Sequence, residues 1–246
     1  MPNRELAQTL VLIKPDALRN SLTGYVLSQM SEFHTGLRFA GTKVVHVTRM
    51  LAEEHYAEHR GKAFFPSLIE YITGRIHYPD EPHKQRVIAI VYQGPDAVEK
   101  VREICGPTNP HVARERKPGC IRSLGTMVPI KNAQGEVIGE RMDNLIHASA
   151  THEEAEREIK LWFKPNEIPP FMRIYATLQS GEHFYYKDGN LRTRYEPGSV
   201  CLLAPGDGVW ESDLNVLHAI HQGAPPPYSL QTVVAKYLTN ETGEGY

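Results

Sequence analysis

The chain has 246 residues, enough for one large domain or for a medium domain with an appended segment. Its 41% hydrophobic and 23% charged residues are typical of a globular protein, and a formal charge of -2 gives no general reason to expect nucleic acid or an anionic membrane as partner. The three cysteines are scattered and form no C-x-x-C pair, which argues against a disulfide framework or zinc knuckle and favours a reducing compartment. Residues 1–8 show no apolar leader and no run reaches membrane-spanning length, so we expect a cytoplasmic protein without a membrane partner.

The first part of the chain alternates between strand and helix patterns. Compact apolar and β-branched runs predict three strands, at 9–13, 39–48 and 86–92. Apolar residues at helical spacing predict four helices, at 21–34, 51–60, 64–73 and 96–105. The polar segment 75–85 contains two prolines and is expected to be a surface loop.

The middle of the chain is less regular. Residues 106–125 are rich in proline, glycine, arginine and lysine without periodicity, which is typical of a segment that builds a site or an interface. Alternation over 127–141 predicts a β-hairpin. A short apolar run at 144–149 predicts one more strand, and an amphipathic helix is expected over 151–163 with Thr151 as its N-cap.

This order of elements, β-α-β-α-β-α-β-α, predicts the fold class. We expect an α/β (α+β) ferredoxin-like sandwich, in which a split β-α-β sheet carries helices on one face. Prolines within 165–170 interrupt the last helix and indicate a boundary. We therefore divide the chain into a domain over 1–165 and an extension over 166–246.

The extension is expected to be β-rich. An Asp-Gly-Asn turn predicts a hairpin over 183–196, and apolar runs predict strands at 200–204 and 232–237. So few strands bury little apolar surface unaided, so we expect the extension to pack on the first domain of its own or a neighbouring subunit. Scattered histidines are more often structural than metal-binding, so we expect no metal site at His183, His218 and His221.

The most informative stretch is 144–149, Asn-Leu-Ile-His-Ala-Ser, in which His147 ends an apolar run just before the capped helix. Neutral imidazole is an effective nucleophile at physiological pH because its pKa lies close to that pH. An isolated histidine in this position would more often be a core residue. Here the segments elsewhere in the chain favour a catalytic role.

Seven short segments, taken in order, resemble those of nucleoside diphosphate kinases. They are Leu-Ile-Lys-Pro-Asp (12–16), Glu-His-Tyr (54–56), Phe-Phe (64–65), Thr-Asn-Pro (108–110), Lys-Pro-Gly (117–119), Ile-Arg (121–122) and Asn-Leu-Ile-His-Ala-Ser (144–149). Each is weak alone, but the shared order over residues 9–165 is highly specific. The fold of that family agrees with the ferredoxin-like prediction.

The resemblance implies a ping-pong phosphoryl transfer, in which His147 takes the γ-phosphoryl group of a nucleoside triphosphate and passes it to a nucleoside diphosphate. It also implies ATP and other nucleoside di- and triphosphates as substrates, Mg²⁺ as cofactor and a homo-oligomer. Lys14 would neutralise the transferred group beside Tyr56, and Glu158 would orient the imidazole. The other implied nucleotide contacts are Phe64 for the base, Arg102, Thr108 and Arg122 for the phosphates, and Asn144 for the sugar.

Simpler interpretations remain open for several of these residues. Lys14 and Arg102 could be ordinary surface cations, and Glu158 could pair with a neighbouring lysine. Phe64 could belong to the core, which would leave Phe65 as the aromatic that stacks on a base.

The chain departs from the family after the histidine, where the common wording Gly-Ser-Asp-Ser is replaced by Ala-Ser-Ala-Thr. Ala150 removes a carboxylate close to the phosphates, and the loss of one such electrostatic contact can slow an enzyme by up to roughly 10²–10³-fold. No acid close by in the sequence replaces it, since the first is Glu153. The second hypothesis is therefore a nucleotide-binding regulatory protein of the same fold with weak or no turnover.

Two insertions, at 75–85 and 127–141, also distinguish the chain from the family. Both precede segments of the expected site. We expect them to reshape the nucleotide entrance or an oligomer contact.

Overall fold

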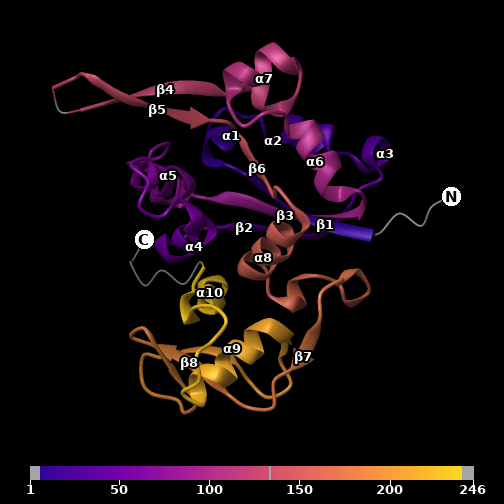
Figure 1. Cartoon of the computed structure of the whole chain (residues 1–246), viewed down its shortest axis with the longest axis vertical. Coiled ribbons are helices and arrows are strands. Elements are labelled where there is room, and N and C mark those ends of the chain that lie inside the picture. Colours follow the sequence, from indigo (N-terminus) through magenta and orange to yellow (C-terminus); the bar gives the residue numbers. More distant parts are fainter. Residues whose placement is uncertain (1–5, 133, 240–246) are drawn as a thin grey trace.

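A computed structural model describes residues 6–132 and 134–239, so the predictions for residues 1–5 and for Ala133 in the hairpin turn lie outside the described residues. The centre is a four-stranded sheet in the order β2-β3-β1-β6, in which all neighbours are antiparallel. Its strands are β1 (Leu6–Ile13), β2 (Arg38–Val45), β3 (Val87–Pro95) and β6 (Ile146–Ala148). This is the expected ferredoxin-like α/β arrangement (Figure 1).

Helices cover both faces of this sheet, so the expectation of helices on one face was wrong. Side chains of β1 alternate between two separate cores, with Leu10 and Leu12 in one and Val11 and Ile13 in the other. One core is closed by α4 (Arg49–His55), α5 (Phe65–Ile72) and α8 (His152–Trp162). The other is closed by α1 (Pro15–Arg19), α2 (Thr23–Gln29) and α6 (Ala97–Cys105).

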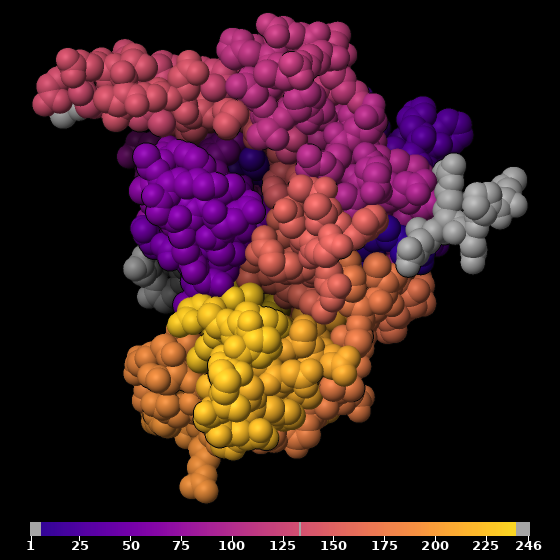
Figure 2. All heavy atoms as spheres, in the orientation of Figure 1, coloured from indigo at the N-terminus to yellow at the C-terminus, as the bar shows by residue number. Residues whose placement is uncertain are grey.

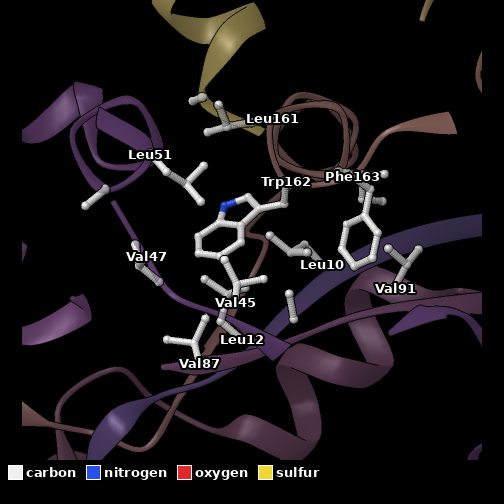
Figure 3. Packing of buried hydrophobic residues seen from close by; sticks show 14 of the residues in the cluster. Leu10, Leu12, Val45, Val47, Leu51, Val87, Val91, Leu161, Trp162 and Phe163 are labelled. Carbon is white, nitrogen blue, oxygen red and sulfur yellow. The ribbon is translucent and has the colours of Figure 1, made fainter. Parts of the chain in front are cut away.

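Trp162, at the end of α8, fills the middle of the first core. Its indole lies among Leu10, Val45 and Leu51, while the ring of Phe163 lies toward Val91 (Figure 3). Both aromatic residues are fully buried. These contacts fix the C-terminal end of α8 on the sheet. They thereby also help to hold the helix that follows His147 in the chain.

Two segments differ locally from the prediction. The single helix expected over 21–34 is divided into α2 and α3 (Glu32–Thr35), with Gly36 in the left-handed conformation at its end. The segment 106–125, expected to be irregular, contains α7 (Pro110–Arg116), which the Asn109 side chain caps, and a 3₁₀ turn (Ile121–Leu124). A cap followed by proline was the available signal for α7. Short 3₁₀ turns also occur at Ala57–His59 and Pro82–Lys84.

The expected hairpin is present as β4 (Thr126–Lys131) and β5 (Val137–Asp143). It projects from the body of the molecule and passes over the region of α5 (Figure 1). Its base joins directly to β6, so its last residues lie next to the strand that carries His147.

The C-terminal segment contains more helix than expected. Its strands are β7 (Thr177–Gln179), β8 (Phe184–Lys187), β9 (Asn190–Arg192), β10 (Val200–Leu203) and β11 (Gly208–Trp210), and its helices are α9 (Glu211–His221) and α10 (Leu230–Val234). Further 3₁₀ turns are Pro165–Glu167, Pro170–Met172 and Ala235–Tyr237. The hairpin β8–β9 and the strand β10 confirm two predictions, whereas α9 was not predicted.

The predicted strand at 232–237 was wrong, because this segment forms α10 and the 3₁₀ turn after it. The Ser229 side chain accepts a hydrogen bond from the Thr232 amide and caps the helix. Leu230, Val233 and Tyr237 then point into one core at helical spacing. The β-branched composition was overridden by the cap and by this burial.

The C-terminal segment packs against the sheet domain of the same chain. Trp210 is fully buried in the first core, and its indole N–H donates a 2.7 Å hydrogen bond to the Phe163 carbonyl. Thr232 donates a 2.7 Å hydrogen bond to the Glu54 carboxylate on α4. The segment also has a small core of its own between α9, α10 and its strands. No helix within the described ranges is long and apolar enough to cross a membrane.

Trp210 is expected to stabilise the whole chain. Trp210→Phe removes the indole N–H and leaves the Phe163 carbonyl without its donor, which should lower the free energy of unfolding by about 1–3 kcal/mol. Trp210→Ala should cost about 3–5 kcal/mol, because it also leaves a cavity. Chemical denaturation measures both, with Phe171→Ala as the matched control because Phe171 is 85% exposed. Equal stability of the Trp210 variants and the control would contradict this packing role.

Candidate active site

A cavity of about 380 Å³ opens beside the end of β6, and every predicted site residue lines it. In Figure 2 the surface is hollowed between the α4–α5 region and the region of α8, below the projecting hairpin. The set comprises Lys14, Tyr56, Phe64, Arg102, Thr108, Arg122, Asn144, His147 and Glu158. These residues come from separate stretches between positions 14 and 158, so the fold brings them together.

The pairing of β1 with β6 places the lysine and the histidine in this cavity. His147 lies directly opposite Leu12 in the antiparallel register, and Lys14 follows β1 two residues later. The Lys14 ammonium donates a 2.7 Å hydrogen bond to the Asn144 side chain, whose amide donates in turn to the Thr108 carbonyl at 2.9 Å. Lys14 is therefore a buried cavity residue rather than a solvated surface cation.

Leu145, between Asn144 and β6, has a left-handed backbone conformation with φ of 70°. Non-glycine residues rarely adopt this conformation, so its neighbours must hold it. The Asp16 carboxylate accepts a hydrogen bond from the Leu145 amide at 2.9 Å, and the Leu145 carbonyl accepts one from the Lys14 amide at 2.9 Å. Asp16 is a site residue that sequence reasoning missed, although it belongs to the quoted Lys-Pro-Asp segment.

His147 is oriented by a buried carboxylate. Its Nε2 lies 2.9 Å from Glu158 on α8, and the Ser149 hydroxyl donates a 2.6 Å hydrogen bond to the same carboxylate oxygen. Burial opposes the charge on Glu158, but the adjacent His147 and the hydrogen bonds from His147 and Ser149 outweigh it and lower the pKa of Glu158 to about 2. An ionised Glu158 retains the imidazole proton on Nε2, so Nδ1 keeps its lone pair.

His55 is a second histidine of the site that sequence reasoning did not single out. Its ring lies edge-on to that of His147 with 4.5 Å between the centroids, and its Nδ1 accepts a 3.2 Å hydrogen bond from the Trp162 indole. Burial holds the pKa of His55 well below its usual value. Its presence in the quoted Glu-His-Tyr segment was the available signal.

The cations of the cavity differ in their surroundings. Burial lowers the pKa of Lys14 to about 8 despite the nearby Asp16, so the ammonium remains mostly charged at neutral pH. Arg122 is also buried and donates hydrogen bonds to the Gly106 and Ile146 carbonyls at 2.9 and 3.3 Å. Arg102 and Thr108 are exposed at the rim of the cavity.

Aromatic and hairpin residues form the remaining walls. Phe64 is 48% exposed and thus not a core residue, whereas Tyr56 is buried beside His55. Residues of the hairpin, namely Ile130, Glu140, Arg141 and Met142, also line the cavity. The hairpin β4–β5 therefore contributes directly to the site. The histidines of the C-terminal segment lie away from this cavity; His218 is beside Glu182 at 3.2 Å.

Comparison with known proteins identifies the family. The sequence profile of the nucleoside diphosphate kinase family matches residues 7–168. The chain is 34% identical over 202 residues to a nucleoside diphosphate kinase of Thermococcus kodakarensis, a match that covers 82% of this chain and 99% of the relative. It is 40% identical over 181 residues to the nucleoside diphosphate kinase of Pyrococcus furiosus, and this match covers 74% of this chain and 94% of the relative. The chain belongs to the nucleoside diphosphate kinase family.

Solved structures of this family show the same fold. A nucleoside diphosphate kinase of Aquifex aeolicus matches with a TM-score of 0.53 and 31% identity, covering 67% of this chain and all of the other. A transition-state mimic of the enzyme from Borrelia burgdorferi, with bound vanadate and ADP, matches with a TM-score of 0.51 and 32% identity. This match covers 69% of this chain and 94% of the other.

Anion binding in this nucleoside diphosphate kinase cavity should depend on the ionisation of Lys14. The pKa of the buried ammonium is about 8, so its charge is present below that pH and is lost as the pH rises through it. The charge of sulfate does not change in this range, so its affinity should fall several-fold between about pH 7 and pH 9. Titration calorimetry measures the change. Lys14→Arg should remove the dependence, since arginine stays charged; an equal pH dependence in that variant would contradict the assignment.

Proposed function

We propose that this chain transfers the γ-phosphoryl group of a nucleoside triphosphate to a nucleoside diphosphate through a phosphohistidine on His147. The lone pair on Nδ1 attacks the γ-phosphorus, the bond from that phosphorus to the bridging oxygen breaks, and the diphosphate leaves with the electron pair. A second diphosphate then takes the group from the histidine by the reverse step. The observation that carries this proposal is the 2.9 Å contact of His147 with the ionised Glu158 inside a cation-lined cavity.

Phosphoryl transfer requires mostly positioning and charge stabilisation from a protein. We assign the stabilisation of the transferred group to Lys14 and Arg122, because both are buried cations beside His147. Tyr56 lies next to them, with a hydroxyl that is buried and without a hydrogen-bond partner among the described residues. Arg102 and Thr108 at the rim would hold the outer phosphates, and Asn144 the sugar.

Phe64 is assigned to the base. Its ring is half exposed at the cavity mouth, where a base can stack on it. Such stacking contributes roughly 1–3 kcal/mol and depends little on which base is present. It therefore suits an enzyme that accepts different nucleotides.

The donor set of the cavity fits Mg²⁺. This ion takes oxygen ligands and is usually held by one or two carboxylates together with substrate phosphates. The carboxylates of Glu58, Glu140 and Glu154 line the cavity. Glu158 lines it too, but its carboxylate already pairs with His147. When bound, the ion neutralises charge on the phosphate oxygens.

The relatives support this proposal. The matched structure from Borrelia burgdorferi is a transition-state mimic with bound vanadate and ADP. A matched structure from Halobacterium salinarum contains CDP. A pocket that holds a nucleoside diphosphate and a phosphoryl analogue together is what the double transfer requires.

The second candidate function is a nucleotide-binding regulatory protein of the same fold with weak or no turnover. Ala150 favours it, because it removes a carboxylate beside the histidine. The paired His147 and Glu158 favour the enzyme, because binding alone needs no oriented imidazole.

We also propose a homo-oligomer in a reducing compartment, the cytoplasm. Phe39 and Val44 expose apolar surface on the edge strand β2, which favours association with another copy. The cysteines Cys105, Cys120 and Cys201 are all free thiols, which suits a reducing environment.

Labelled ATP tests the proposed reaction. Incubation with γ-labelled ATP should leave acid-labile label on the protein, and GDP should remove this label as GTP. His147→Ala should abolish both steps, because it removes the imidazole that accepts the phosphoryl. His152→Ala is the matched control, because His152 is exposed on α8 and pairs with Glu99, outside the cavity. Nucleotide binding without any label would instead establish the regulatory protein.

A further inference from the structure

Glu154, in the first turn of α8, lines the cavity that contains His147. Its Oε2 accepts a 2.9 Å hydrogen bond from the amide of Ala150. The Glu154 side chain thus folds back to Ala150, the position near which we expected no acid from the sequence. That expectation was wrong, because the helical turn returns Glu154 to a residue four positions earlier.

The hydrogen bond to Ala150 uses only one oxygen of Glu154. Thr151 is the N-cap of α8 and accepts from the Glu154 amide at 3.1 Å, so the two residues form a variant of a capping box. Among the described residues, the structure records no cation paired with Glu154. A partly buried carboxylate therefore faces the cavity with one oxygen free for a ligand.

Charge indicates which ligand this oxygen would take. Lys14, Arg102 and Arg122 make the cavity attractive to a polyphosphate, but a carboxylate at its wall would repel the same phosphates. A divalent cation between carboxylate and phosphates reverses the repulsion. A nucleotide without a cation gains nothing from Glu154, whereas a nucleotide–metal complex does.

The other carboxylates of the cavity are less suitable. Glu158 is occupied by His147 and Ser149. The Glu58 side chain is 64% exposed and lies 3.5 Å from His59, and Glu140 lies on the exposed hairpin. Ala150, which Glu154 contacts, also shares a surface hollow with Arg102. Glu154 is thus a cavity carboxylate that contacts Ala150, and Ala150 borders the hollow that Arg102 also lines.

We propose that Glu154 is the carboxylate that binds the divalent cation of the nucleotide–metal complex, reaching from α8 into the place that Ala150 leaves without an acid. This inference rests on the proposed function, since it assumes a nucleotide in the cavity. It assigns a metal-binding role to a helix-capping residue. It also explains how the chain retains its reaction despite Ala150.

Binding of ADP with and without Mg²⁺ tests the assignment in the full chain. Calorimetry should show that Mg²⁺ strengthens ADP binding to the unaltered protein. In Glu154→Gln this enhancement should shrink about tenfold, which corresponds to about 1.4 kcal/mol, while metal-free affinity is kept or improved. Glutamine can still accept from the Ala150 amide, so the cap and the melting temperature should change little. Glu153→Gln is the matched control, because Glu153 is exposed and does not line this cavity.

A second variant separates the metal role from a structural one. Ala150→Asp combined with Glu154→Gln places a carboxylate at the adjacent position and should restore the Mg²⁺ enhancement. The paramagnetic signal of Mn²⁺ titrated in the presence of ADP gives an independent readout. An unchanged enhancement in Glu154→Gln would overturn the assignment and leave the proposed function standing. A failure of the unaltered protein to bind ADP would overturn both.

Discussion

The antiparallel pairing of β6 with β1 is the constraint on which the rest of the site depends. Only three residue pairs connect the two strands, from Val11–Ala148 to Ile13–Ile146. Because side chains alternate along a strand, a shift by one residue would turn His147 away from the cavity and expose an apolar side chain instead. The register also brings the Lys14 ammonium to Asn144, so histidine and cation are placed by one interaction.

The backbone before β6 shows how this register is fixed. Leu145 adopts a left-handed conformation, which allows the chain to turn from the hairpin into the strand. Asp16 and Lys14, which follow β1, bind its amide and its carbonyl. The segment that carries the cavity lysine therefore also stabilises this unfavourable conformation, through the backbone of Lys14 and the side chain of Asp16. The hydrogen bond to Leu145 accounts for a buried carboxylate so close to a buried lysine.

Much of this arrangement could be predicted from the sequence. Lys14 and His147 each follow a short apolar run in the sequence, and the antiparallel pairing of β1 with the short strand β6 brings them to the same cavity. Resemblance to a family supplied Glu158, Arg122 and Tyr56, which no periodicity would have selected. The hairpin β4–β5 could be predicted from alternation alone. These predictions depended on local patterns and on matched segments.

The remainder depended on tertiary contacts. The run at 232–237 has the composition of a strand, but a serine cap and burial on one side make it helical. Helices cover both faces of the sheet because its strands are buried on both sides, and the continuous apolar runs at 9–13 and 86–92 were a signal for this that the prediction did not use. His55 and Glu154 were missed for a similar reason: their roles are set by the indole of Trp162 and by one turn of helix, not by their neighbours in sequence.

The C-terminal segment belongs to the same argument because it meets the site through α4. Glu54 accepts a hydrogen bond from Thr232, and the next two residues, His55 and Tyr56, line the cavity. From α8, the Arg157 guanidinium donates to the carbonyls of Glu54 and His55 at 3.3 and 3.2 Å. The end of α4 is thus held between α10 and α8. Since α8 also carries Glu158, the contacts that attach the C-terminal segment and those that orient His147 converge on one packed pair of helices.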